Sequence, residues 1–154
     1  MKSKFIYVSY IKTTPEKLWK SLTTSDDIPR WWGGGLRIQC EWKAGSPWRM
    51  SYENGRVADQ GEILESHPPQ HLVIRWQNEW NPELKKEGFS LCAFDLEGME
   101  GAVKLTVTHG IDLPDSKFIE AVSAGWPMVL SNLKSLLETG EIVLKERTEQ
   151  YGRG

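Results

Sequence analysis

His109 is the residue whose type and position most suggest chemistry. It follows a segment in which every second side chain from Val103 to Val107 is apolar, so it lies at the end of the inner face of a predicted strand. An imidazole in that position can anchor a carboxylate or exchange a proton near neutral pH. No nucleophile or second acid accompanies it in the sequence, and an isolated histidine is commonly a structural residue. We therefore predict no catalytic residues.

Two other patterns resemble ion or phosphate sites but lack the required context. His67 and His71 have the spacing of two metal ligands on one helical turn, yet Pro68 and Pro69 between them exclude that helix. The three glycines at 33–35 follow two tryptophans and precede a strand, whereas a phosphate-binding loop leads from a strand into a helix. We expect no metal and no cofactor.

The two cysteines, Cys40 and Cys92, lie in separate strand-like segments without the Cys-x-x-Cys spacing of a redox or metal site. Free cysteines commonly behave as small core residues, so we predict buried, reduced thiols. A disulfide or a reactive thiol is the alternative interpretation.

Size and charge narrow the class of protein. The chain has 154 residues and a net charge of -2, with a pI near 6.0. It therefore lacks the strong positive field that nucleic acid or anionic lipid attracts. The apolar run at 5–11 is too short and too polar for a signal peptide or a membrane span. We expect a cytoplasmic protein with one domain over residues 1–144 and a flexible tail over 145–154.

Tryptophan is the unusual component of the composition. Each indole ring buries on the order of 200 Å² and carries one N–H donor, so a tryptophan-rich interior is rigid and suits amphipathic ligands. The chain has eight, at positions 19, 31, 32, 42, 48, 76, 80 and 126.

The first third of the chain predicts one strand and two short helices. Residues 4–12 carry apolar side chains on both faces, so we expect a central strand there. Thr13, Pro15 and Glu16 have the positions of a helix cap, a first-turn proline and a capping-box glutamate. A second short helix starts near Ser25 and ends at the glycines of 33–35.

From residue 36 the apolar period changes to two, which predicts strands. Asn54 and Gly55 form the clearest hairpin signal in the chain, and the connections indicate antiparallel neighbours. The six predicted strands cover residues 36–43, 48–53, 56–66, 72–77, 89–97 and 102–109, and a polar loop covers 78–87.

The last predicted element is a long helix over residues 125–138. Its apolar residues recur at three-and-four spacing, and this stripe requires a sheet as its partner. Residues 115–124 can form a preliminary helical segment. Pro127 lacks the N–H of the helix ladder, which predicts a start near Gly125 or a kink there.

This order of elements resembles the α+β helix-grip fold of the START-like (SRPBCC, birch-pollen-allergen-like) superfamily. In that fold a curved antiparallel sheet of about seven strands wraps around a long C-terminal helix. Six segments in matching order resemble more closely the domain called activator of heat-shock-protein-90 ATPase homologue: TPEKLWKSLT at 14–23, RWWG at 30–33, GEIL at 61–64, LVIRW at 72–76, KLTVTH at 104–109, and GW at 125–126 followed by Leu130 and Leu133.

The resemblance implies a cavity between the long helix and the sheet. The expected ligand is a small apolar or amphipathic molecule, in a pocket of roughly 300 to 1,000 Å³. An interior filled by the protein's own side chains is the alternative. The predicted ligand-binding residues are Trp31, Trp32, Trp76, Phe94, Val107, His109, Trp126, Leu130 and Leu133.

Two further functions follow from the resemblance alone. One is a co-chaperone or protein-interaction role with a chaperone partner in the stress response. Full-length eukaryotic relatives have a separate N-terminal domain that contributes to chaperone contact, and this sequence begins at its first strand, so ligand binding is the preferred prediction. The other is a cyclase-like enzyme, for which the sequence offers only His109.

Overall fold

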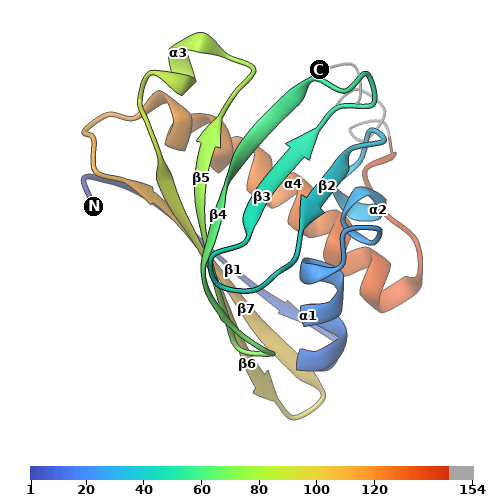
Figure 1. Cartoon of the computed structure of the whole chain (residues 1–154). Coiled ribbons are helices and arrows are strands. Elements are labelled where there is room, and N and C mark those ends of the chain that lie inside the picture. Colours follow the sequence, from blue (N-terminus) through green and yellow to red (C-terminus); the bar gives the residue numbers. More distant parts are fainter. Residues whose placement is uncertain (146–154) are drawn as a thin grey trace.

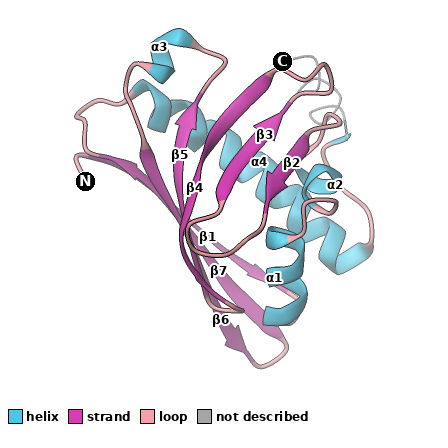
Figure 2. Ribbon diagram, viewed as in Figure 1, coloured by secondary structure: helices cyan, strands magenta, loops and turns pink. Residues whose placement is uncertain are grey.

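The computed structural model describes residues 1–145 and has the predicted α+β helix-grip fold, in which a seven-stranded antiparallel sheet curves around one long helix (Figure 1). Figure 2 shows this helix, α4, crossing one face of the sheet. In chain order the elements are β1 Ser3–Ile11, α1 Pro15–Thr23, α2 Ile28–Trp32, β2 Arg37–Cys40, β3 Pro47–Ser51, β4 Val57–His67, β5 His71–Asn78, α3 Pro82–Lys85, β6 Ser90–Met99, β7 Ala102–Ile111 and α4 Lys117–Thr139.

The first strand lies at an edge of the sheet, so the prediction of a central strand is wrong. The strand order is β1-β7-β6-β5-β4-β3-β2, and β1 pairs only with β7. The apolar side chains on its outer face, Ile6, Val8 and Tyr10, are exposed. They suggested burial on both faces because the sequence does not reveal whether a second layer covers a strand.

The two short helices are present, but each starts later than predicted. Thr14, not Thr13, caps α1 by accepting a hydrogen bond from the backbone N–H of Lys17, and Pro15 occupies the first turn. Helix α2 begins at Ile28 rather than near Ser25, and no side chain caps it. Gly33 ends α2 with a φ of 111°, a conformation that favours glycine. The helices pack on different parts of the fold: α1 contacts β6, while α2 lies against α4.

The long helix begins eight residues earlier than Gly125, at Lys117. Ser116 caps it by accepting a hydrogen bond from the backbone N–H of Ile119, and the helix continues through Pro127 to Gly140. Of the predicted preliminary segment 115–124, residues 117–124 therefore supply the first turns of the same helix. Among residues 1–145, no helix is both long enough and apolar enough to cross a membrane.

The predicted polar loop at 78–87 contains a short helix, α3. Asn81 caps it, because its side-chain oxygen accepts a hydrogen bond from the backbone N–H of Glu83.

Strand β2 also differs from the prediction, ending at Cys40, and Trp42 beyond it has a left-handed φ of 57°. Lys145 is the only residue of the predicted tail that the structure describes; 146–154 lie outside the described residues.

Tryptophans fill the space between the sheet and the helices, and one glycine brings two of them together. Gly61 of β4 lies opposite Trp48 of β3 on one side and Trp76 of β5 on the other. A Cβ atom at Gly61 would lie only 1.6 Å from the carbonyl oxygen of Arg75, so only glycine fits. The two indole centroids are 4.4 Å apart.

Both cysteines are free thiols, with Cys92 buried and Cys40 half-buried.

Candidate functional site

A pocket of about 180 Å³ lies between the N-terminal half of α4, the adjoining ends of β4 and β5, and the segment that carries α3. It is smaller than the predicted 300 to 1,000 Å³ because indole side chains occupy much of the interior. Its walls are mostly apolar, and they are formed by Trp32, Asp59, Trp76, Asn78, Trp80, Leu84, Phe118, Ala121, Val122, Gly125, Trp126 and Val129.

Beyond this pocket the interior is filled. Trp32 lies at the centre of a cluster of tryptophans. The centroid of its ring is 5.6 Å from that of Trp31, 6.0 Å from that of Trp76 and 5.2 Å from that of Trp126. A gap of only about 20 Å³ remains among the side chains on the far side of this cluster. That volume is close to the minimum that holds one water molecule, so of these two spaces beside the tryptophan cluster only the first is large enough for a ligand.

Within residues 1–145, Asp59 is the only carboxylate that lines the pocket. It is 5% exposed, and its Oδ1 accepts hydrogen bonds from Nε1 of Trp76 at 3.0 Å and Nδ2 of Asn78 at 3.3 Å. No residue within 1–145 donates a hydrogen bond to its Oδ2. Burial raises the pKa of the Asp59 carboxyl to about 7, although the two hydrogen bonds oppose that shift and nearby Glu79 adds to it.

The sequence analysis missed Asp59, although a signal was present. Ile63 is a clear inward residue of β4, and counting back in steps of two from it places Gly61 and then Asp59 on the same inner face. The glycine interrupts the apolar pattern and conceals this alternation. An acidic residue on the inner face of a strand is a strong indication of a functional or bonded carboxylate.

His109 is fully buried and has a hydrogen bond at each ring nitrogen. Nδ1 accepts from Nε1 of Trp126 at 3.0 Å, so the ring proton resides on Nε2. Nε2 lies 2.8 Å from Oγ of Ser90, which itself donates to the carbonyl oxygen of Trp76. Burial lowers the pKa of His109 to about 3, which keeps the ring neutral. This arrangement fixes Trp126 and gives the cyclase-like alternative no support.

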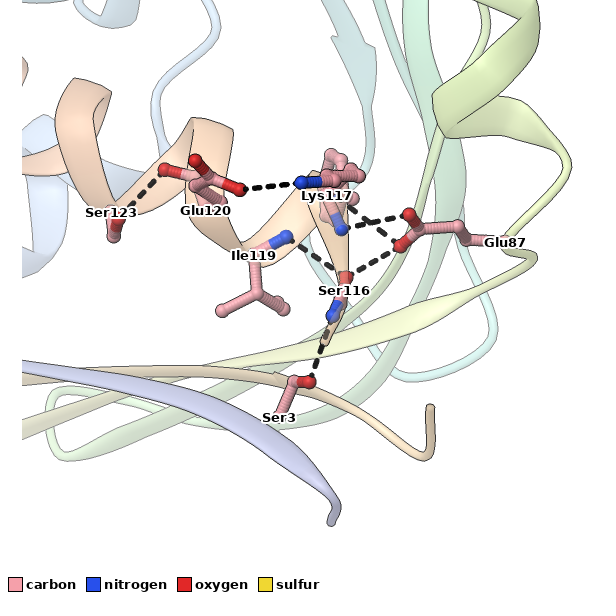
Figure 3. A network of polar contacts seen from close by, with 8 residues as sticks. Ser3, Glu87, Ser116, Lys117, Ile119, Glu120 and Ser123 are labelled. Carbon is pink, nitrogen blue, oxygen red and sulfur yellow. Dashed lines mark hydrogen bonds and ion pairs between the residues drawn. The ribbon is translucent and has the colours of Figure 1, made fainter. Parts of the chain in front are cut away.

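The carboxylate of Glu87 connects the α3 segment to the start of α4 (Figure 3). It accepts hydrogen bonds from the Ser116 hydroxyl and from the backbone N–H groups of Lys117 and Phe118. A negative charge at a helix N-terminus stabilises the unpaired N–H groups of the first turn. Because Trp80, Phe118 and other residues of these two segments line the pocket, Glu87 holds two of its walls together.

The predicted ligand-binding residues fall into three groups. Trp32, Trp76 and Trp126 line the pocket. Trp31 and Phe94 border the narrow gap behind the tryptophan cluster. The remaining four are buried in the packed interior and do not line the pocket: Val107, His109, Leu130 and Leu133.

The histidine pair that resembled a metal motif has a different arrangement. His67 and His71 face each other across the β4–β5 turn, and Nδ1 of His71 lies 2.6 Å from Oδ1 of Asp95. That hydrogen bond raises the pKa of His71. Within residues 1–145, no group of three or more potential ligand side chains is arranged to hold a metal ion.

Comparison with protein-family models assigns the chain to one family. The model of the family described as activator of Hsp90 ATPase homolog 1-like protein matches residues 12–138. The chain belongs to this family. The match includes β2 to β7, all the residues that line the pocket and most of α4, but not β1, so the candidate site lies within the part of the chain that matches the family. Among curated proteins, none matches this sequence.

Solved structures support the fold. The chain is similar to an Aha1 dimer from Colwellia psychrerythraea, with a TM-score of 0.73 and 22% identity over 90% of this chain and 98% of that one. A protein from Mesorhizobium loti has a TM-score of 0.77 and 22% identity over 91% and 100%. An HSP90 activator from Plasmodium falciparum has a TM-score of 0.70 and 22% identity over 87% and 95%. At this identity the likenesses support the fold alone.

Proposed function

We propose that this activator of Hsp90 ATPase homolog 1-like protein binds a small apolar or amphipathic molecule in the pocket beside α4. The observation that supports this function best is an aromatic-lined space of about 180 Å³ adjoining an interior that is otherwise filled. Closely packed proteins rarely keep such a space at a boundary between a helix and a sheet without a use for it. A cavity of roughly 150 Å³ takes one benzene molecule, so the ligand is of comparable size or extends out of the pocket.

The α3 segment forms the outer wall of the proposed site. Trp80 is 37% exposed at the mouth, and its backbone carbonyl accepts a hydrogen bond from Arg56 at 3.0 Å. Lys85 pairs with Glu79 at 2.7 Å across the same segment. These contacts are polar and lie near the surface, so they open at a lower free energy than the packed core does. Ligand entry through this wall is the simplest route.

Gly125 provides the sharpest test of the proposal. It lines the pocket in the middle of α4, and a Cβ atom built there meets nothing within 4 Å. We expect Gly125→Leu to extend a side chain into the pocket from this uncrowded Cβ position, and it replaces a poor helix former by a good one. We expect a folded protein that is at least as stable and has lost binding by at least about tenfold, equivalent to about 1.4 kcal/mol.

The measurement is intrinsic tryptophan fluorescence together with thermal denaturation, during titration with small aromatic and aliphatic compounds. Ala124→Leu, on the exposed side of the same helix turn, is the matched control and should bind as the wild type does. If no compound alters the fluorescence or the melting temperature of the wild type, ligand binding at this pocket is wrong. Equal binding by the Gly125→Leu variant would place the ligand elsewhere.

A co-chaperone role is the second candidate, supported by the family description and by the HSP90 activator among the similar structures. It predicts that the purified chain accelerates ATP hydrolysis by Hsp90. The assay compares the hydrolysis rate with and without an excess of the chain. An unchanged rate, with no complex on size-exclusion chromatography, would exclude this role.

A further inference from the structure

Among residues 1–145, the pocket wall carries one carboxylate, that of Asp59, and no basic side chain. Oδ2 of Asp59 accepts no hydrogen bond from residues 1–145, and none of the residues that line the pocket is Lys, Arg or His. A carboxylate oxygen with free acceptor capacity in an otherwise apolar pocket favours a ligand that donates a hydrogen bond to it. Two basic side chains that contact pocket segments have other partners: Lys85 pairs with Glu79, and Arg56 donates to the carbonyl oxygen of Trp80.

Aromatic rings surround this acceptor. Four indoles, those of Trp32, Trp76, Trp80 and Trp126, line the pocket together with the ring of Phe118. The faces of indole rings attract cations, and tryptophan is the strongest of the aromatic residues in this respect. A buried carboxylate beside several indoles favours an ammonium group over a carboxylate or a phosphate, which Asp59 would repel. The apolar walls require an apolar body attached to that group.

We propose that the pocket binds a primary amine with a small aromatic or branched aliphatic body, whose ammonium group donates a hydrogen bond to Oδ2 of Asp59. This inference rests on the proposed function and adds the chemical class of its ligand. The apolar body lies against Phe118 and the small α4 residues Ala121 and Gly125, and the ammonium group points toward β4. Charge-assisted hydrogen bonds of this kind are about twice as strong as neutral ones.

The proposal predicts a characteristic dependence on pH. An ammonium ligand requires the ionised carboxylate, whereas burial holds the pKa of Asp59 at about 7 in the free protein. Amine binding should therefore strengthen as the pH rises from about 6 to about 8. Tyr52 and Glu79 also interact electrostatically with Asp59, and neither changes charge between these pH values. His109, on β7, stays neutral, and α4 contributes only uncharged side chains to the pocket.

The test compares two probes of nearly the same shape, phenethylamine and 2-phenylethanol, by calorimetry and tryptophan fluorescence on the full chain. At about pH 8 the amine is protonated, and we expect it to bind at least about tenfold more tightly than the alcohol. Asp59→Asn keeps an oxygen for Trp76 and Asn78 and removes the charge, so the amine should lose its advantage. Glu79→Gln is the matched control, since Glu79 lies nearby but does not line the pocket, and it should retain the preference.

The outcomes separate this inference from the function on which it rests. If neither probe binds the wild type, both the pocket function and the amine class are wrong. If both bind equally, or if the amine preference survives Asp59→Asn, the pocket binds apolar molecules and the amine inference is overturned. Should Asp59→Asn fail to fold, the wild type still decides, because amine affinity that does not rise between about pH 6 and about pH 8 contradicts the proposal.

Discussion

The space between α4 and the sheet has a filled half, around His109, and an open half, the pocket beside Asp59. The buried polar groups of the two halves differ in how fully they are hydrogen-bonded. In the filled half, His109 has a partner at each ring nitrogen, and its neighbours Ser90 and Trp126 are satisfied by the same network. In the open half, Asp59 has two donors at one oxygen and none from residues 1–145 at the other. A satisfied polar network specifies a rigid core, whereas an incompletely satisfied one leaves a place for a ligand. The same tryptophan cluster therefore forms part of a rigid core on one side and part of the pocket wall on the other.

The largest expected effect is a difference in the free energy of unfolding between a change in the tryptophan cluster and a change at the pocket mouth. Trp126 is 2% exposed and contacts the rings of Trp32, Trp76 and Phe94. Trp126→Ala should reduce the free energy of unfolding by about 3 to 5 kcal/mol, because it leaves a large cavity. Trp80→Ala, at the exposed mouth, should cost less than about 1 kcal/mol. Urea denaturation measures both variants, and similar losses would mean that the mouth is as tightly packed as the core.

The second expected effect comes from the charge of Asp59. The pKa of its folded state, about 7, lies above its ordinary value of 3.8, so between these values the folded protein holds a proton that the unfolded chain releases. Stability from this group therefore falls as the pH rises from about 4 to about 7, by at most about 4 kcal/mol. Asp59→Asn should remove this slope and stabilise the protein most at about pH 8. The measurement is urea denaturation at a series of pH values, and an unchanged slope would show that Asp59 is ionised throughout.

A third, smaller effect tests the filled half. His109→Phe leaves the Trp126 indole N–H without its acceptor and the Ser90 hydroxyl without its donor. We expect a loss of about 2 to 3 kcal/mol in the free energy of unfolding. The Cys92→Ala variant removes a buried side chain on the neighbouring strand without breaking a hydrogen bond and serves as the control. If His109→Phe lowered the free energy of unfolding by less than Cys92→Ala does, water would be replacing the hydrogen bonds that the histidine makes to Trp126 and Ser90.

The smallest effect concerns the contact between the two pocket walls. Glu87→Ala removes the carboxylate that caps the first turn of α4, which should cost about 1 kcal/mol. The amide protons of Lys117 and Phe118 should exchange faster with solvent, as measured by hydrogen exchange. Glu83→Ala, an exposed change on α3, is the matched control and should leave those amides unaffected. Equal exchange in the two variants would exclude Glu87 as the link.

The sequence predicted most of the fold because most of its signals are local. The alternation in β7, the first-turn proline of α1 and the hairpin at Asn54 each depend on a few neighbouring residues. The edge position of β1 was not predictable in this way, since it depends on which strand pairs with it across the sheet.

The candidate site was predicted in outline and missed in its polar details. Trp32, Trp76 and Trp126 were expected around the ligand, and all three line the pocket. The pocket volume depends on how indole rings pack, which no local pattern encodes. Glu87 acts on a helix that begins 30 residues later in the chain, so a search for nearby caps could not find it.

Pro127 divides α4 at the boundary between the two halves. It has no N–H to donate to the carbonyl of Ser123, so the helix continues across it with one ladder hydrogen bond fewer. The turns before it and Val129 after it line the pocket, whereas Leu130 and Leu133 belong to the packed interior. The missing ladder hydrogen bond therefore lies in the part of α4 that forms the pocket wall.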